Sequence, residues 1–474
     1  MDLHNDMPSL RLLQHWMSSY ARRHAIVALL TAAHCLASTV VFGALAEPAA
    51  DRIREVEEGR LTEANAAWWG FDPEDATDSL QRAIHSKAKR IRIPMAPGPW
   101  IVRPIQLRSG LELILEPGAL VLAKSGEFRG GGDSLFRAVD ATNIVIRGYG
   151  ATLRMRKADY QRPPYPKAEW RMGLNFSGCR DVRVEGLRIE SSGGDGIYIG
   201  SSQTNRWCEN VVIRDCTAID HHRQGISIIS AVNLAIENCS FSGTAGTAPE
   251  AGIDFEPDEP DERLVNCVVR NCSFTDNQGN AALVYLKPLT GKSVPVSIRF
   301  EDCHARMGPS GATPDQLLAV DRGGWSGFAV GAVRDHGPAG TIDFVRCTSE
   351  NTGRECVRIF DKSPDGVRVR FVDCTWKNAW IARHRDYAGP RAPILFQSRD
   401  AKLASALGGV DFVNCRLFTD LPSPAVRLDA DTDGVVAQSI TGTISMPEVD
   451  KHPVHWTLAK PGVTLRLEPL SPTP

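Results

Sequence analysis

The sequence lacks an excess of charge of either sign: 54 Lys and Arg stand against 56 Asp and Glu, a net charge of −2. This balance provides no basic surface for a nucleic-acid partner. Beyond the N-terminal region the chain also lacks an apolar run long enough to cross a bilayer. From Ile101 onward it lacks long helical patterns as well. These absences argue against nucleic-acid binding, a multispanning membrane protein and a helical fold.

The N-terminal region has the pattern of a targeting segment. Arg22 and Arg23 precede a mainly apolar run over residues 25–46, which ends Ala-Leu-Ala at 44–46, a small-x-small cleavage site. The paired arginines weakly suggest a twin-arginine signal. We therefore predict that residues 1–46 are a signal peptide and that the mature protein is exported, periplasmic or secreted, without a membrane attachment. The alternative is an uncleaved membrane anchor, because the run is long enough to span.

A repeat organises the middle of the chain. Gly196, Gly225 and Gly252 lie 29 and 27 residues apart, and each is followed by Ile and an alternating strand-like pattern. A period of this length indicates stacked structural units, and alternation indicates a strand in each. Two rows are predicted, one stacked inside and one outside: Ile197, Ile226 and Ile253, and Tyr198, Ser227 and Asp254. We interpret the outer row as the working face.

Short strands recur along the rest of the chain, many of them followed by Asp-Cys or Asn-Cys. The predicted strands are Leu111–Leu115, Ile144–Ile146, Val182–Ile189, Val211–Ile213, Leu234–Ile236, Val296–Phe300, Ile342–Val345, Val367–Phe371 and Val410–Val413. The recurring cysteines are Cys216, Cys239, Cys272, Cys303, Cys347, Cys374 and Cys415. Because we predict export, and exported proteins with many cysteines often contain disulfides, a disulfide framework is one interpretation of these residues. Their repeated position at a strand-to-turn corner favours a ladder of buried, reduced thiols.

Residues 47–96 are predicted to form an N-terminal cap. Thr77–Gln81 offers helix N-cap chemistry, and an apolar face follows at Leu80 and Ile84. A short helix here would cover the open end of a stack. The alternating segment Arg90–Pro94 is the first expected strand.

This combination of repeats, corner cysteines and an N-terminal helix before the first strand resembles the pectin-lyase-like right-handed parallel β-helix superfamily, over roughly residues 70–445. The resemblance implies an all-β, single-stranded right-handed parallel β-helix with a short N-terminal capping helix, and a groove along one face where carbohydrate usually binds. The expected organisation is a cap over 47–96, the β-helix over 97–445 and a C-terminal cap or tail over 446–474.

Within that superfamily, polygalacturonases are the most similar in motif. Asp195-Gly196 matches the last two residues of their Asn-Thr-Asp-Gly signature, but Arg223-Gln224 stands where they carry an Asp pair. Glu250-Ala251-Gly252 likewise stands where they carry Gly-His-Gly. The Asp-Pro-His-Glu signature of alginate epimerases is also missing. The resemblance therefore leaves a plain polygalacturonase unlikely.

Three acids are the predicted catalytic residues. Asp195, Asp254 and Glu256 fall on or beside consecutive turns, and two turns correspond to ~9.6 Å along a parallel stack. That is close to the ~6.5–9.5 Å between the carboxyls of inverting glycosidases. Each has a structural alternative: Gly-Asp-Gly serves as a turn, and Glu256 begins an acidic run typical of a solvated loop. Asp254 is expected to point outward.

Seven further residues are predicted to bind substrate: Tyr198, His222, Arg223, Gln224, Lys287, Trp170 and Trp207. His and Arg suit a sugar carboxylate, and aromatic rings suit sugar faces. The alternatives are a polar turn at 221–224 and loops whose aromatics pack onto the solenoid.

We predict an exported carbohydrate-active protein, in the first place an inverting glycoside hydrolase. The alternatives are a polysaccharide lyase acting on uronates through His222, Arg223 or Lys287, and a glycan-binding solenoid without catalysis. No cofactor or metal is expected, with Ca²⁺ as the alternative because some related lyases use it.

Overall fold

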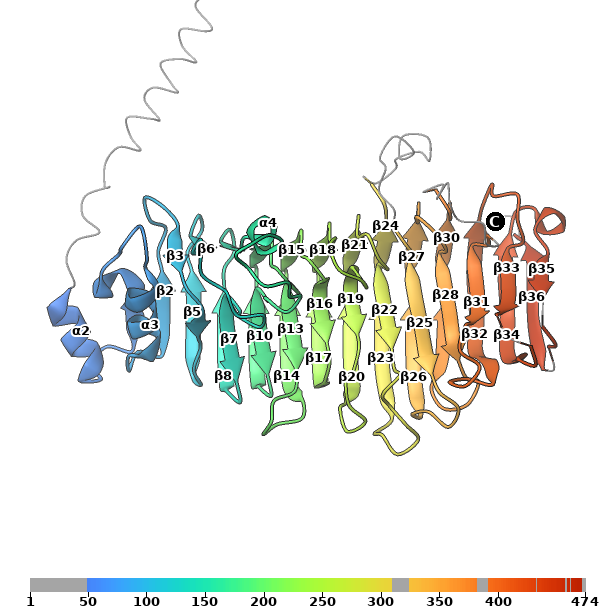
Figure 1. Cartoon of the computed structure of the whole chain (residues 1–474), viewed down its shortest axis with the longest axis horizontal. Coiled ribbons are helices and arrows are strands. Elements are labelled where there is room, and N and C mark those ends of the chain that lie inside the picture. The colour runs from blue at the N-terminus through green and yellow to red at the C-terminus, as the bar shows by residue number, and fades with distance from the viewer. Residues whose placement is uncertain are drawn as a thin grey trace, which may run out of the picture. The chain divides into compact units, whose positions relative to one another are not determined.

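The computed structural model describes residues 49–308, 324–381, 391–431, 433–456, 458–460 and 462–470. The predicted signal segment over 1–46 lies outside these residues, as do Cys35 and Tyr387. Within them, no helix has the length and apolar character needed to cross a membrane. Ala49 and the residues after it form one unit of stacked strands, coloured from blue to red in Figure 1.

Most turns of the stack have three strands, and from residue 406 onward a single longer strand takes the place of the first two. Strands of neighbouring turns pair in parallel with their equivalents. The first ladder contains β1 (Glu63–Asn65), β2 (Arg90–Ile93), β5 (Leu111–Leu115), β8 (Thr142–Arg147), β11 (Arg180–Glu185), β14 (Cys208–Arg214), β17 (Ala231–Glu237), β20 (Leu264–Arg270), β23 (Val296–Glu301), β26 (Gly340–Val345), β29 (Arg368–Val372), β32 (Ala406–Phe418), β34 (Val436–Met446) and β36 (Val463–Pro469). The boundaries expected at residues 97 and 445 fall inside this ladder.

The second ladder consists of short strands that follow the first around a corner. They are β3 (Trp100–Val102), β6 (Leu120–Ala123), β9 (Thr152–Arg154), β12 (Arg188–Glu190), β15 (Thr217–Ile219), β18 (Ser240–Ser242), β21 (Ser273–Thr275), β24 (His304–Arg306), β27 (Thr348–Glu350) and β30 (Thr375–Lys377). The single strand predicted over Val182–Ile189 is wrong: it divides into β11 and β12, because the chain turns the corner at Gly186 with φ +71°.

The third ladder is a separate 12-stranded sheet that carries the predicted working face. Its strands are β4 (Ile105–Gln106), β7 (Phe136–Val139), β10 (Leu174–Ser177), β13 (Ile197–Gly200), β16 (Gln224–Ile228), β19 (Ala251–Phe255), β22 (Ala282–Tyr285), β25 (Phe328–Val333), β28 (Val357–Lys362), β31 (Ile394–Ser398), β33 (Val426–Ala430) and β35 (Val454–Trp456). Ile197, Ile226 and Ile253 pair in register and are buried, so the predicted solenoid repeat is confirmed.

Among the described residues the helices are few and short: α2 (Ala50–Glu57), η1 (Ala66–Trp69), α3 (Thr77–His85), α4 (Lys157–Tyr160) and η2 (Val449–Lys451). The expected capping helix is α3, which packs against η1 and β3 at the N-terminal end of the stack. Its N-cap residue is Ala76, without a side-chain cap bond. Asp75 instead accepts from the backbone N–H of Thr77 at 3.1 Å.

The cysteine ladder is confirmed: the seven corner cysteines are buried and form no disulfide. The residue before each cysteine explains the Asp-Cys and Asn-Cys repeat. Asp215, Asn238 and Asn271 adopt φ of 56°, 55° and 51°, a left-handed corner that Asn and Asp tolerate better than other side chains. On later turns of the stack four rings form a stacked column. The distances between successive ring centroids are 4.8, 4.8 and 5.5 Å along Phe300, Phe344, Phe371 and Phe412.

Candidate active site

Asp195 lies directly before β13, where a long loop returns to the stack. Arg171, at the end of that loop, forms an antiparallel bridge with Gly193. A Cβ on Gly194 would lie 2.6 Å from the backbone oxygen of Glu169. The glycine pair before Asp195 is therefore needed for this close approach, and it places the loop carrying Glu169 against the acid.

Asp254 lies in the outward row, and the predicted register is confirmed. Tyr198 pairs with Ser227, and Ser227 with Asp254, on consecutive turns. The expected exposure of Asp254 is wrong, because Asp254, like Asp195, has 0% of its surface exposed. Side chains of the adjoining turns, including Gln224, pack over the outer face of this sheet. The acids therefore form a buried cluster rather than an exposed row.

Arg223 is the centre of this cluster. Its Nη2 contacts Glu256 Oε2 at 2.8 Å, its Nε lies 3.4 Å from Glu169 Oε2, and its Nη1 lies 4.0 Å from Asp195 Oδ1. These carboxylates come from three separate places: the loop before β10, the turn before β13 and the end of β19. Only 15% of the Arg223 side chain is exposed, against 25% for Glu256. The guanidinium of Arg223 thus lies within 4.0 Å of three carboxyl groups.

Gln224 connects the cluster to the next turn. Its Nε2 donates to Asp254 Oδ2 at 2.8 Å, and its Oε1 accepts from the backbone N–H of Ala251 at 2.8 Å. Among the described residues no well-formed hydrogen bond reaches the other Asp254 oxygen, Oδ1, or either oxygen of Asp195, although Glu256 approaches Asp254 and the Ser227 hydroxyl approaches Asp195.

The burial of these acids changes their protonation. Loss of solvation raises the pKa of Asp195 to about 7, although Arg223 opposes the shift. Burial and the neighbouring Glu256 raise the pKa of Asp254 well above its ordinary value. Asp258, just beyond Glu256, has its pKa raised to about 6 by desolvation and by Glu262 and Glu256. Near neutral pH the site therefore holds both carboxylic acids and carboxylates, the mixture that acid–base catalysis requires.

The two histidines of the 221–224 turn point to other partners. His222 Nε2 bonds the Thr247 hydroxyl at 2.9 Å, and burial lowers the pKa of His222. His221 is fully buried, its Nδ1 lies 2.8 Å from the Ser192 hydroxyl, and burial lowers its pKa to about 3. Both imidazoles are therefore uncharged at neutral pH, and no ion pair joins His222 to the acids in the described part of the chain.

The remaining predicted residues surround the cluster at different distances. Tyr198 is half-buried in the row of Asp254, and its ring lies along Gly200. Trp170 is 55% exposed and follows Glu169 in the loop. Trp207 stacks under Arg263, whose guanidinium carbon lies 3.7 Å from the ring centre. Lys287 is exposed past the end of β22. The structure thus joins Asp195, Arg223, Gln224, Asp254 and Glu256, and leaves Trp207 and Lys287 outside.

Two acids of the site were not among the predicted catalytic or substrate-binding residues. Glu169 contributes an ion pair to Arg223, but nothing in the Pro-rich loop around it signals that the loop folds back at Gly193. Asp258 was assigned to a solvated acidic run. Glu262, which is buried, accepts from the backbone N–H groups of Asp258 and Glu259 at 2.6 and 3.0 Å, and so holds this run against the sheet.

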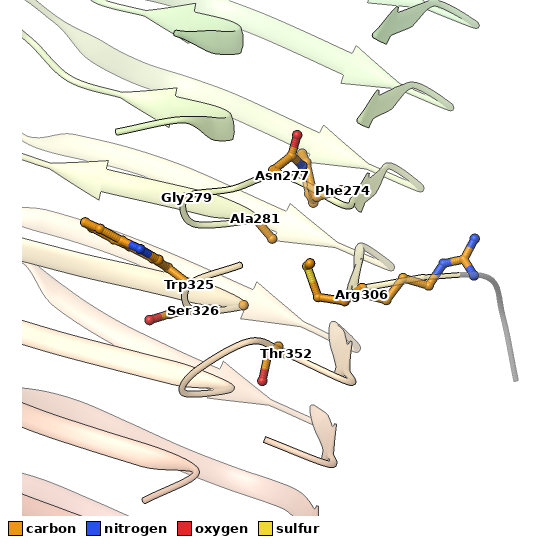
Figure 2. Close-up of a pocket in the computed structure, with 10 residues that line it drawn as sticks. Phe274, Asn277, Gly279, Ala281, Arg306, Trp325, Ser326 and Thr352 are labelled. Atoms are coloured by element: carbon orange, nitrogen blue, oxygen red, sulfur yellow. The ribbon is translucent and has the colours of Figure 1, made fainter. Parts of the chain in front are cut away.

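A small pocket, partly open to solvent, lies on the turns after the acids (Figure 2). Its lining comes from the ends of the β21, β22, β24 and β25 turns: Phe274, Asn277, Gly279, Ala281, Arg306, Met307, Trp325, Ser326, Gly327 and Thr352. Figure 2 shows Trp325 and Arg306 reaching out on opposite sides. None of these lining residues is a carboxylate, so the pocket cannot supply an acid–base pair.

The acid cluster does not fit a Ca²⁺ ion. Calcium needs six to eight oxygen ligands around one point, whereas a guanidinium occupies the centre between Glu169, Asp195 and Glu256. In the described ranges no group of three or more His, Cys, Asp or Glu is arranged to hold a metal.

Comparison with known proteins agrees with this architecture. The family model described as "right handed beta helix region" matches residues 167–305, which include all of the acids above. The chain folds as a right-handed parallel β-helix. This β-helix is similar to the family 28 exopolygalacturonase of Yersinia enterocolitica, with a TM-score of 0.56 and 15% identity over 87% of this chain and 79% of that one. It is also similar to the mannuronan C-5 epimerase A-module of Azotobacter vinelandii, with a TM-score of 0.51 and 16% identity over 86% of this chain and 98% of that one.

Two Bacillus subtilis proteins match parts of the β-helix in sequence. One, the uncharacterized protein YclG, is 34% identical over 96 residues, 19% of this chain. The other, the SPbeta prophage-derived uncharacterized protein YorA, is 25% identical over 169 residues, 33% of this chain. The matched stretches span only 16% and 28% of those two relatives. Together these similarities establish the fold, while the chemistry depends on the residues of the site.

Proposed function

We propose that this β-helix is an exported glycoside hydrolase that acts on a polysaccharide or oligosaccharide with inversion at the anomeric carbon. The observation that carries the proposal is a pair of buried acids with raised pKa, Asp195 and Asp254, beside the ion-paired carboxylate of Glu256. Hydrolysis of a glycosidic bond needs one protonated carboxyl and one carboxylate on the same site. The fold shared with an exopolygalacturonase supports a carbohydrate substrate.

In this mechanism Asp195 donates its proton to the leaving glycosidic oxygen. A pKa of about 7 keeps much of Asp195 protonated at neutral pH, as a general acid requires. Glu256 accepts a proton from the attacking water, and Arg223 holds that carboxylate in place. Asp254, fixed by Gln224, lies beside Glu256 and acts with it as the pair that handles the proton of the attacking water. Because Asp195 has no exposed surface, substrate contact requires Arg223 and the loop carrying Glu169 to shift away from it.

The lyase alternative needs a positive side chain to neutralise a uronate carboxylate and a base to remove the adjacent proton. Arg223 already faces three acids of the protein, and His222 bonds Thr247. These contacts favour the hydrolase over the lyase.

The test is digestion of a polysaccharide panel by wild-type protein and by Asp195→Asn. Reducing-sugar release by wild type, lost in the variant, supports a hydrolase, and NMR of the first-formed anomer reports inversion or retention. Ultraviolet absorbance of an unsaturated uronate would identify a lyase instead. Binding without any product would identify the non-catalytic solenoid.

A further inference from the structure

The charge around the site suggests what kind of glycan it accepts. Arg223 is the cation whose field opposes the raised pKa of Asp195, Asp254 and Asp258 alike. Its own ion pairs are to Glu169, Glu256 and Asp195. Even with protons on Asp195 and Asp254, the carboxylates of Glu169, Glu256 and Asp258 outnumber this single guanidinium.

The buried oxygens point to a ligand that brings donors rather than negative charge. Asp195 Oδ1 and Oδ2 and Asp254 Oδ1 are buried, and no well-formed hydrogen bond reaches them in the described chain, although the Ser227 hydroxyl approaches Asp195 and Glu256 approaches Asp254. Buried carboxyl oxygens are costly to leave unpaired. A sugar hydroxyl can donate to them, whereas a sugar carboxylate would add a like charge. Like charges held close together in a partly buried site repel strongly, because the effective dielectric constant there is far below that of water.

Other arginines of the outward row are too distant to neutralise an anionic sugar bound here. Along the register, Arg137 precedes Asp254 by four turns, through Asn175, Tyr198 and Ser227. Arg358 follows it by three, through Leu283 and Ala329. Three turns correspond to ~14 Å, more than a Debye length at physiological salt. Arg358 also donates to Gln397 at 2.9 Å, and Arg399 pairs with Asp361 at 2.9 Å.

The strand of Asp254 and the turns after it carry apolar side chains on this face instead. A small buried cluster contains Ala251, Leu283, Ala329, Ala332 and Phe360, and the partly exposed Tyr285 and Leu403 pack on it. Tyr285 is half-buried and lies 6.4 Å from the Phe360 ring. Apolar and aromatic side chains suit the C–H faces of an uncharged sugar.

Resting on the proposed function above, we propose that the substrate is a glycan without carboxylates or sulfates, and that the acids around Arg223 exclude polyuronates. The site would thus select sugars that carry no charge, and its acids would provide both the chemistry and this selectivity.

The test measures binding and turnover with a matched pair of polymers, polygalacturonate and the galactan made from it by carboxyl reduction, within a panel of neutral glucans, galactans, mannans and xylans. We expect the strongest binder and the turned-over substrate to be neutral. We also expect the reduced polymer to bind at least about tenfold better than polygalacturonate at low salt, with the gap narrowing as salt screens the repulsion.

Asp258→Asn should reduce the difference in affinity between the two polymers, by raising the affinity for polygalacturonate several-fold. Glu57→Gln, on α2 at the N-terminal end of the stack, should leave this difference unchanged. Polygalacturonate or alginate as the preferred substrate would overturn the inference while leaving the hydrolase intact. Neutral glycans that bind without product would sustain the inference and refute the proposed hydrolysis. Failure to bind any glycan would refute both.

Discussion

Gln224 and Asp254 are joined across two neighbouring turns by a buried hydrogen bond of 2.8 Å from Nε2 to Oδ2. The donor is neutral, so the bond does not require charge on Asp254, in agreement with the raised pKa of that acid. Because Gln224 also accepts from Ala251 N–H, a single side chain satisfies groups on both turns.

Gln224→Leu should therefore destabilise the protein. The substitution leaves the Ala251 N–H and one Asp254 oxygen without their present partner, at ~1–3 kcal/mol for each buried group. Urea unfolding should show a loss of about 2–5 kcal/mol. Gln161→Leu, at an exposed position, is the matched control and should change stability by about 0.5 kcal/mol or less. Equal effects of the two substitutions would contradict the structural role of Gln224.

Asp195 should make stability depend on pH. Its pKa is about 7 in the folded protein and near 3.8 in the unfolded chain, so between these values the folded state binds more protons than the unfolded state. The free energy of unfolding should then fall as pH rises from about 4 to about 7, and level off above. Asp195→Asn should reduce this slope, to which Asp254 and Asp258 contribute with the same sign, and should gain roughly 1–4 kcal/mol over wild type at pH 8. A slope in the variant as steep as in wild type would count against the buried, protonated acid.

Asp254→Asn tests the catalytic assignment separately from stability. Asparagine keeps the size of the side chain and an oxygen for the Gln224 amide, and it introduces no charge into a buried position. Turnover on the glycan found by the panel should fall by ~10²–10⁴, while the thermal midpoint holds. Wild-type turnover in this variant would remove Asp254 from the mechanism. A large drop in the midpoint would assign it a structural role.

Lys362 predicts a second pH effect, far from the acids. Its side chain is buried, Nζ donates to the Ser363 carbonyl at 2.6 Å, and burial lowers its pKa from 10.5 to about 7. Between pH 7 and 10.5 the unfolded chain binds the proton that the folded chain does not, so stability should rise with pH across this window. Lys362→Met should flatten that rise, and the exposed Lys402→Met should not. Thermal melts from pH 7 to 10 measure both.

The corner cysteines should be unreactive in the native protein. All seven are buried thiols without disulfide partners. A thiol reagent should leave them unmodified in buffer and titrate them fully after denaturation without reductant. Incomplete titration of the denatured protein would indicate disulfides.

The fold could be predicted because its signals are local and repeated. Ile197, Ile226 and Ile253 mark one rung each, and the Asp-Cys and Asn-Cys corners record a left-handed backbone that few residues tolerate. The division of β11 from β12 was not predicted, although the alternation changes phase at the Gly186 corner: the apolar residues are Val182 and Val184 before it and Leu187 and Ile189 after it.

The site was harder to predict, because alternation gives the side of a strand and not what lies over it. The register placed Asp254 above Ser227, but the covering side chains come from adjoining turns, so its burial was missed. Glu169 was missed for the same reason: its place beside Arg223 depends on the return of a long loop to Gly193.

The strands β13, β16 and β19, which carry the acids, stand in the middle of the 12-stranded ladder. A solenoid behaves as a one-dimensional chain of nearest-neighbour interfaces, and its terminal rungs fray first because each has a neighbour on one side only. Opening the site backbone therefore means breaking interfaces on both sides or peeling several turns from an end. The central position therefore keeps the arrangement of the acids unaffected by fraying of the terminal turns, the motion that a solenoid undergoes most easily.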